Sequence, residues 1–378
     1  MIIQRMTAPA PQIPSAPPAR LAPLFAFSAE GACPLPMLGV LRASGEDAAK
    51  FLQAQLTQDV LEMRPGGPAR LAAFCTPKGR MSASFIITRP AENEFLLACS
   101  RELIAGLVKR LSLFVMRAKV KITDASSAIA CHGLIGAAAI AAAQTTIQAA
   151  APADAASPEG QTASGLPPLP QLAELPPACG LPRALWLAPA GASAPAASAL
   201  SENDWLAAEV LAGVARITSA TAGAFVPQML NYESVGGVHF HKGCYPGQEV
   251  VARSQFRGVI KRRAFVAHCA AAVQTGQEIF VGGDDQPAGL IALAAAAPGG
   301  GSLVIAGLQI AAALGSEPLH AGSPGGPREL APRANLTTAE NPWPLRLLSS
   351  KIDQYVARMS QVWVEGQIIQ PMSSRRRT

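Results

Sequence analysis

Residues 242–249 read Lys242-Gly243-Cys244-Tyr245-Pro246-Gly247-Gln248-Glu249. Pro246 suits the first position of a helix, because its missing N–H would have no partner there and its φ is already helical. We therefore expect a helix from here to about residue 257, ended by Gly258. Cys244 would then lie just before the helix N-terminus, where the helix dipole and the Lys242 ammonium both favour the thiolate. The stretch predicts a reactive cysteine; the alternative is a small buried residue in a tight glycine turn.

Length and composition indicate a multidomain protein that does not cross a membrane. The chain has 378 residues, too many for one ordinary core, which predicts two or three domains. The most apolar stretch, 129–150, is rich in alanine and includes Cys131, His132 and Gln144. A spanning helix would need a long run of larger apolar residues. The N-terminal residues also lack the apolar centre of a secretory signal. We expect a cytoplasmic protein.

The cysteines and the charge limit the chemistry further. The seven cysteines contain no C-x-x-C pair, which argues against a disulfide framework and a zinc knuckle. The net charge of +6 permits an anionic partner. A basic cluster lies at 253–263, either as a solvated face or as a contact for phosphate or polyglutamate. Because no aromatic residues are interleaved with it in a way typical of RNA readout, direct nucleic-acid binding is not expected.

The first half of the chain predicts a mixed α+β arrangement. Ser44 should cap a helix with Asp47 at its third position, since Leu52, Leu56 and Val60 then recur on one face. Strands are expected at 70–75 and 81–88, joined as a hairpin by the turn at 76–80. Further along, we expect a strand at 95–99, a helix at 102–113 and a strand at 115–122.

The second half of the chain begins with an unusual segment. Residues 134–149 can form a helix, but 151–180 are rich in alanine and proline and predict an irregular insertion. A helix should start after Ser201 and run to about residue 212. Short apolar runs alternate with glycine turns over 265–314, which predicts a small antiparallel barrel or sandwich.

Several motifs resemble one known family. The run Phe225-Val226-Pro227-Gln228-Met229-Leu230-Asn231, then Gly236-Gly237, then Lys242 through Arg253, closely resembles the signature of the YgfZ family of folate-binding proteins. Residues 44–60 and 75–81 also resemble this family's N-terminal blocks. The resemblance covers about 35–123 and 201–314. The family is in turn similar to the T-protein, the aminomethyltransferase of glycine cleavage.

The resemblance implies an α+β fold with three domains in a ring around a folate cavity. A discontinuous folate-binding domain would comprise 35–88 and 201–262. A second α+β domain, 89–200, would carry the insertion at 151–180. A C-terminal antiparallel β-barrel domain would span 263–335. A disordered proline-rich extension at 1–34 and an atypical tail at 336–378 would flank them.

The resemblance also implies tetrahydrofolate as the cofactor. A tryptophan at the position of Trp205 contacts folate in related proteins, although the alternative is an ordinary core anchor for its helix. The family's other folate-contacting tryptophan is matched here by Leu38, which offers apolar contact without equivalent stacking. Lys242 would activate the thiol or attract the glutamate tail of folate. The expected folate contacts are Trp205, Leu38, Lys242, Tyr245, Gln248 and Arg253.

Two histidines and two carboxylates are candidates for metal ligands and for acid–base groups, respectively. His239 and His241 form an H-x-H pair, but without an evident third ligand no metal site is predicted. Asp59 and Glu233 are the default candidates for a carboxylate at the reactive nitrogens of folate. Neither has a spacing that singles it out for that task.

The expected function follows from the family. It is a folate-binding accessory protein that supports iron–sulfur cluster assembly or repair, including the upkeep of iron–sulfur enzymes that modify tRNA. Its partners would be folate and iron–sulfur assembly proteins or client enzymes. The alternative is a C1-transferring enzyme of the aminomethyltransferase kind. A weaker third possibility, suggested by charge alone, is a tRNA-binding module.

Overall fold

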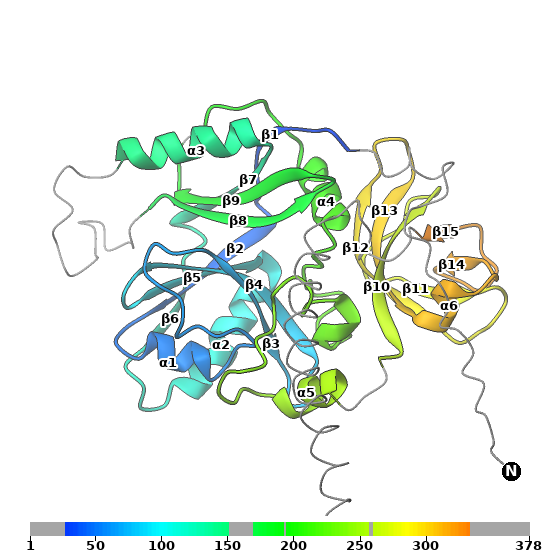
Figure 1. The fold of residues 1–378 in the computed structure, drawn as a ribbon, viewed down its shortest axis with the longest axis horizontal. Helices are drawn as coiled ribbons and strands as arrows, with labels where there is room; N and C mark the ends of the chain where they lie inside the picture. Colours follow the sequence, from blue (N-terminus) through cyan, green and yellow to red (C-terminus); the bar gives the residue numbers. More distant parts are fainter. Residues whose placement is uncertain (1–26, 151–168, 193, 257–259, 333–378) are drawn as a thin grey trace, which may run out of the picture.

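The computed structural model describes residues 27–150, 169–192, 194–256 and 260–332. These residues form two antiparallel sheets on one side of the molecule and a closed barrel on the other, with helix α4 between them (Figure 1). Among them, no helix is both long enough and apolar enough to cross a membrane.

The first sheet has five strands in the order β3-β4-β5-β2-β6. Its interior holds Phe74, Phe85 and Phe95, against which α1 and α2 pack. Strand β3 pairs with β4 from Arg70 opposite Ile87 onward, so the predicted hairpin is confirmed. The bounds of these elements are β2 (Leu38–Ser44), α1 (Ala48–Gln53), β3 (Arg70–Cys75), β4 (Met81–Ala91), β5 (Glu94–Ser100), α2 (Ile104–Val115) and β6 (Lys121–Asp124).

Two expectations for this region need correction. Ser44 does not cap a helix, because it is the last residue of β2. The chain turns at Gly45, with a positive φ of 129°, and α1 begins only at Ala48. The Asp47 side chain does not cap this helix but accepts from the N–H of Lys119 at 2.8 Å. The sheet also continues to Asp124, so the expected domain division after residue 88 falls inside β4.

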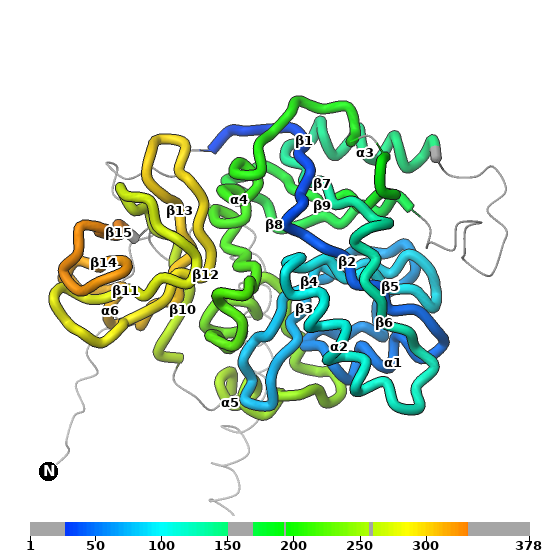
Figure 2. The backbone as a smooth tube through the Cα atoms, turned by 180° about the vertical axis from the view of Figure 1, so that it is seen from behind, coloured from blue at the N-terminus to red at the C-terminus, as the bar shows by residue number. Residues whose placement is uncertain are grey.

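The second sheet has four strands in the order β1-β7-β9-β8. Helix α3 covers its outer face and packs against Trp186 and Leu134. The N-terminal strand joins the same sheet beside β7, as the tube view shows (Figure 2). The bounds are β1 (Gly31–Pro34), β7 (Ile129–Ile135), α3 (Ala137–Ala150), β8 (Gln171–Ala178) and β9 (Leu181–Pro189).

This sheet corrects the expected extension and the expected insertion. Residues 31–34, assigned to a disordered extension, pair with β7, while residues 1–26 lie outside the described residues. Residues 171–178, assigned to an irregular insertion, form β8, while 151–168 lie outside the described residues. The prolines that obscured β8 fall at an irregularity of the ladder between Leu175 and Ala178, a position that tolerates a missing N–H.

The predicted C-terminal barrel is confirmed. Six strands close in the order β10-β13-β12-β11-β14-β15 around an interior that includes Phe265, Ile291 and Val304. The predicted tail at 336–378 lies outside the described residues. The bounds are β10 (Arg262–Cys269), β11 (Glu278–Val281), β12 (Gly289–Ala296), β13 (Ser302–Gln309), α6 (Ile310–Leu314), β14 (Leu319–Ala321) and β15 (Glu329–Pro332).

Helix α4 (Glu202–Leu211) joins the two sides of the molecule. It starts where predicted, because Ser201 and Asp204 form a reciprocal capping box: the Ser201 Oγ accepts from the Asp204 N–H at 3.1 Å and the Asp204 carboxylate accepts from the Ser201 N–H at 2.9 Å. The side chain of Asn203 exchanges two hydrogen bonds with the backbone of Ala296 in β12, at 2.9 and 2.8 Å. One apolar cluster therefore runs through both sheets, α4 and the barrel.

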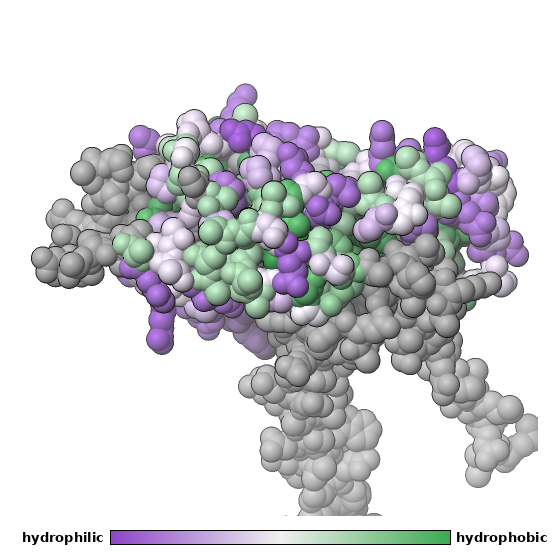
Figure 3. Space-filling view, turned by 90° about the horizontal axis from the view of Figure 1, so that it is seen from above, coloured by the Kyte–Doolittle hydropathy of each residue, from purple (hydrophilic) through white to green (hydrophobic). Residues whose placement is uncertain are grey.

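The upper face of the molecule, which includes α3, is mixed in hydropathy (Figure 3). Figure 3 shows weakly apolar side chains in pale green interspersed with single hydrophilic ones. The alanines on the outer side of α3, such as Ala137 and Ala141, are exposed there. Isolated exposed apolar residues of this kind are ordinary on a protein surface.

Candidate functional site

Cys244 lies in an exposed loop ahead of α5 (Gln248–Phe256). The expected helix begins two residues after Pro246, because Gly247 adopts a left-handed φ of 80° and interrupts the helical conformation. Cys244 is therefore four residues ahead of the first helical residue, outside the turn in which a helix dipole acts strongly. The expected stop at Gly258 lies outside the described residues. Of the seven cysteines, Cys244 is the exposed one; five are buried and Cys179 is half-buried.

The loop before α5 rests directly on the turn of the β3–β4 hairpin. A Cβ on Gly247 would lie 2.3 Å from the carbonyl oxygen of Thr76 and 2.6 Å from the Cα of Gly79. Gly79 has a φ of 70°, and a Cβ there would lie 2.8 Å from the Cβ of Val250. Only glycine fits either position, so the two motifs of the sequence meet at a pair of glycines.

Lys242 points toward α1. Its ammonium donates hydrogen bonds to the backbone carbonyls of Gln53 and Leu56, the latter at 2.5 Å. Gln53 is the last residue of α1, where carbonyls lack helical partners and a cation is favourable. Burial lowers the pKa of Lys242 to about 8, although the Asp59 carboxylate opposes this shift. The ammonium also lies 5.1 Å from the centre of the Tyr245 ring, so Tyr245 packs against the cation that fastens the loop to α1.

The Gly236-Gly237 motif docks on the segment that follows α1. The Thr57 hydroxyl donates to the carbonyl of Gly237 at 2.6 Å, and the Gln58 amide donates to the carbonyl of Gly236 at 2.6 Å. The His239 N–H donates to the carbonyl of Thr57 at 2.8 Å. A Cβ on Gly237 would lie 2.2 Å from the Tyr232 ring, which requires glycine at this position.

His239 lies beside two carboxylates. Asp59, Glu62 and His239 each bring a potential metal-ligand atom within 4.8 Å of the others, a cluster that the sequence did not indicate. Burial lowers the pKa of His239, which favours the neutral ring. However, the Arg70 guanidinium donates to Glu62 at 3.3 Å and to the backbone carbonyl of Asp59 at 2.8 Å, so the carboxylates already have a positive charge beside them. The rings of His239 and His241 are 6.2 Å apart, centre to centre.

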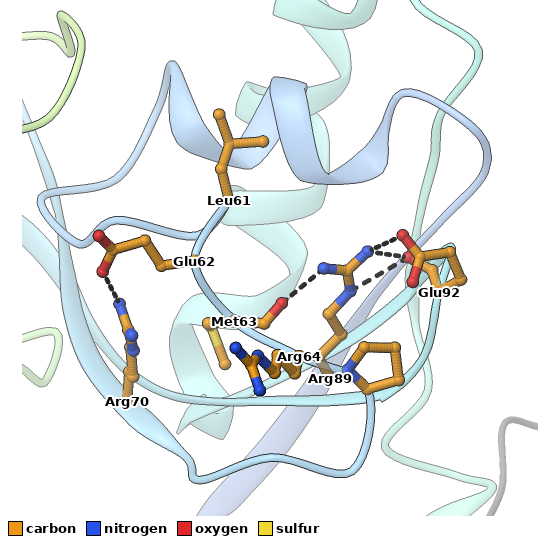
Figure 4. Close-up of a pocket in the computed structure, with 8 residues that line it drawn as sticks. Leu61, Glu62, Met63, Arg64, Arg70, Arg89 and Glu92 are labelled. Atoms are coloured by element: carbon orange, nitrogen blue, oxygen red, sulfur yellow. Dashed lines mark hydrogen bonds and ion pairs between the residues drawn. The ribbon is translucent and has the colours of Figure 1, made fainter.

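An open pocket of about 570 Å³ adjoins this cluster. Its arginines are largely engaged: Arg70 with Glu62, and Arg89 with Glu92 at 2.6 Å and with the Met63 carbonyl at 2.5 Å (Figure 4). These contacts tie the loop after α1 to the edge of the sheet. They indicate a structural role for most of the polar groups in this pocket.

Trp205 lies in a different environment, in the core where the two sheets meet α4. It is 0% exposed, and its indole approaches the backbone of β7 so closely that a Cβ on Gly133 would lie 2.4 Å from its ring. The Arg183 guanidinium of β9 lies 5.1 Å from the ring centre. Leu38, 3% exposed, belongs to the same core cluster.

Two buried donors in this core have no hydrogen-bond partner among the described residues. They are the Trp205 Nε1–H and one terminal amino group of Arg183. The Arg183 Nε–H donates to the carbonyl of Pro176 at 3.0 Å, and burial lowers the pKa of Arg183 to about 10 against the opposing charge of Glu209. Buried donors are nearly always paired in native proteins, so this pair marks a place for the acceptors of a ligand or of water. The sequence did not single out Arg183, which lies among the few charged residues of an alanine-rich segment.

The remaining residues predicted to form the site lie in different environments. Tyr245 is buried beside Lys242, Gln248 is half-buried at the start of α5, and Arg253 is exposed and paired with Glu249 at 2.5 Å. Glu233 forms an ion pair with Arg263, which connects the motif loop to β10.

Comparisons with known proteins agree with this architecture. The family model described as the GCVT N-terminal domain matches residues 30–159. The tRNA-modifying protein YgfZ of Colwellia psychrerythraea is 32% identical over 227 residues, covering 60% of this chain and 68% of that protein. The tRNA-modifying protein YgfZ of Klebsiella pneumoniae is 34% identical over 227 residues, covering 58% of this chain and 65% of that protein.

A solved structure shows the same fold at greater distance. The glycine cleavage system aminomethyltransferase T from Bartonella henselae superposes with a TM-score of 0.56 at 15% identity, covering 85% of this chain and 90% of that chain. The predicted family and the predicted aminomethyltransferase-type fold with its C-terminal barrel are thus both confirmed. The chain belongs to the YgfZ family, built on the GCVT fold.

Proposed function

We propose that this protein binds tetrahydrofolate in its central core and supports the assembly or repair of iron–sulfur clusters, including those of enzymes that modify tRNA. Support comes from its membership of a family whose relatives are named tRNA-modifying proteins. Further support comes from the fold it shares with an aminomethyltransferase. The observation that carries the proposal is the pair of buried, unpartnered donors on Trp205 and Arg183.

The residues present fit a folate. A pterin ring offers carbonyl and ring-nitrogen acceptors, and the glutamate portion offers carboxylates, so either end can accept from an indole N–H and a guanidinium. Gly133 and Arg183 both contact the Trp205 ring, and the buried indole N–H has no partner among the described residues, so it would be left for an acceptor of the ligand. Leu38 would add apolar contact from β2. Tetrahydrofolate, when bound, would supply a carrier for one-carbon groups.

Cys244 would provide the contact with a partner protein. An exposed thiol can meet a client protein, whereas buried thiols cannot. The pinning of the neighbouring Lys242 to α1 holds the loop in a defined position. Cys244 would thus be presented at a fixed place on the surface, available for sulfur handling or for a transient bond to a partner.

The carboxylates give less support to the alternative, a C1 transferase. Such an enzyme would need a carboxylate at the reactive nitrogens of folate. Glu233 is 8% exposed and engaged with Arg263. Asp59 lies with His239 and Glu62 beside Arg70. The proposal therefore keeps the accessory role.

Calorimetric titration with tetrahydrofolate tests the binding site directly. We compare the wild type with Trp205→Phe, which removes the N–H and keeps a ring, and with Arg183→Met. Trp186→Phe is the matched control, because it removes another buried indole N–H on the face of the same sheet that α3 covers. Saturable binding that weakens in the first two variants and persists in the control supports the site. If none of the three variants weakens binding, folate binds at another site. If the wild type does not bind tetrahydrofolate, the folate proposal is refuted.

Complementation tests the accessory role. In a strain lacking this gene, we measure the activity of an iron–sulfur enzyme that modifies tRNA. We expect rescue by the wild type and by Cys179→Ser, which alters a half-buried thiol, but weak rescue by Cys244→Ser. Full rescue by Cys244→Ser would show that the accessory role does not require the Cys244 thiol.

A further inference from the structure

A second pocket, of about 310 Å³, lies away from the central core, between the 3₁₀ helix at Pro227–Leu230, α5 and the start of β10. Apolar and cationic side chains make up most of its lining, which also includes Gln228 and Ser254. The apolar ones are Val226, Met229 and Ile260, and the cationic ones are Arg253, Lys261 and Arg262.

The charge of this pocket is positive and largely uncompensated. No acidic residue is among the described residues that line it. Arg253 pairs with Glu249 across one turn of α5, but both side chains are mostly exposed, so this pair is weak. Lys261 and Arg262 form no ion pair within the described part of the chain. Two or three cations that converge on one small pocket favour an anionic ligand.

Gln228 adds an unmet hydrogen-bonding group to the same pocket. It is 0% exposed, and its amide donates to the carbonyl of Val251 at 2.8 Å. Its side-chain oxygen has no partner among the described residues. A buried acceptor without a donor costs free energy, so a ligand N–H that reached this oxygen through the pocket wall would be stabilised there.

We propose that this pocket binds one nucleotide unit. The phosphate would lie against Lys261 and Arg262, and the flat base would rest on the apolar residues, where the thioether of Met229 favours contact with an aromatic ring. An amino or imino group of the base would donate to Gln228. A free nucleotide and a nucleotide within an RNA chain share this chemistry.

The proposal revises one expectation from the sequence. Nucleic-acid contact was not expected, because the basic stretch at 253–263 lacks suitably interleaved aromatic residues. In the folded protein, the apolar surface comes from Ile260 together with Val226 and Met229, which lie some thirty positions earlier in the chain. The volume of the pocket is at the lower end of the range for small-molecule sites, which suits a mononucleotide better than a larger ligand.

Equilibrium dialysis of the full chain tests the proposal with five probes: 5′-AMP, adenosine, inorganic phosphate, a pentaglutamate peptide and a 5′-phosphorylated RNA tetranucleotide. We expect one site for 5′-AMP, with adenosine and phosphate each bound about tenfold more weakly because each satisfies only part of the pocket. Lys261→Glu and Arg262→Glu should each weaken 5′-AMP binding by about tenfold or more. Lys109→Glu, at an exposed lysine of α2, makes the same charge change elsewhere and should leave binding within about twofold.

The probes also separate the two sources of the nucleotide. If the tetranucleotide binds more tightly than 5′-AMP, and its binding is lost in the same variants, the pocket is assigned to RNA. If the two ligands bind with equal affinity, the pocket is assigned to a free nucleotide. The proposal fails if 5′-AMP does not saturate, if the charge reversals leave its affinity unchanged while thermal unfolding shows a folded protein, or if pentaglutamate binds in preference to 5′-AMP. None of these results depends on whether tetrahydrofolate binds in the central core.

Discussion

At the scale of single residues, the most constrained side chain near Cys244 is Lys242. It places a cation at the C-terminus of α1 and fixes the loop that carries the motif. The sequence suggested instead that Lys242 would act on the thiol or on a glutamate tail. A role of Lys242 in activating the thiol or in binding a glutamate tail stays a prediction. In the structure, the Lys242 ammonium is directed toward two backbone carbonyls instead.

The lowered pKa of Lys242 predicts a pH dependence of stability. The unfolded chain keeps this proton up to about pH 10.5, whereas the folded protein releases it near pH 8. Between these values the unfolded state binds more protons, so the contribution of Lys242 to stability should rise as the pH rises. Urea unfolding of the wild type and Lys242→Met at pH 7.5 and pH 10 measures this as an increasing difference between the two proteins. Lys109→Met controls for overall charge, and a difference that is constant or falling with pH would contradict the prediction.

Gly247 offers a second test at this scale. Gly247→Ala should destabilise the protein by about 2 kcal/mol or more, because the new Cβ meets the Thr76 carbonyl and the left-handed φ is unfavourable for alanine. Gly243→Ala, in the same loop, meets no atom within 4 Å and should change stability by less than about 0.5 kcal/mol. Chemical denaturation measures both, and equal losses would show that the contact with the hairpin turn does not hold the loop.

At the scale of secondary-structure elements, the start of α4 depends on its capping box. Ser201→Ala removes the acceptor for the Asp204 N–H and should cost about 0.5–2 kcal/mol. Ser254→Ala is a suitable comparison, because the Ser254 hydroxyl donates to the carbonyl of Val250 within α5 and caps no helix end. Thermal unfolding should show a clear loss for the first variant and a small one for the second. A neutral Ser201→Ala would mean that packing alone positions α4.

The elements that could be predicted from sequence are those specified by local patterns. The hairpin predicted at 70–88, the helix predicted to start after Ser201 and the barrel strands all follow from short-range signals of alternation, capping and turns. Strand β8 escaped prediction because its two prolines are tolerated only at an irregularity that its partner β9 defines. The helix cap expected at Ser44 failed because pairing with β5 keeps that residue in a strand.

The candidate site was predictable only in part for the same reason. Sequence reasoning located the loop with Cys244, because glycine, proline and lysine around a cysteine form a local pattern. It did not find Arg183 beside Trp205, nor Gly79 against Gly247, because these contacts join segments far apart in the chain. Long-range contacts of this kind leave no local signal in a single sequence.

At the scale of the whole molecule, Phe225 connects parts of the protein that are distant in sequence. Its carbonyl accepts from the N–H of Met81 at the start of β4, at 2.8 Å. Its ring lies against β13 of the barrel, where a Cβ on Gly307 would be 2.5 Å from it. Phe225, which is 4% exposed, therefore contacts both the first sheet and the barrel.

Phe225→Ala should consequently weaken the whole molecule rather than one domain. Loss of a buried phenylalanine costs about 3–5 kcal/mol, and here the cavity would open at the junction between the sheet and the barrel. We expect faster hydrogen exchange in both β4 and β13, together with a lower midpoint of urea unfolding. Phe256→Ala, at a phenylalanine that is 56% exposed, should cost less than about 1 kcal/mol and leave both strands protected. Faster exchange confined to the barrel would show that the first sheet is stable without this contact, and that the two sides of the molecule unfold separately.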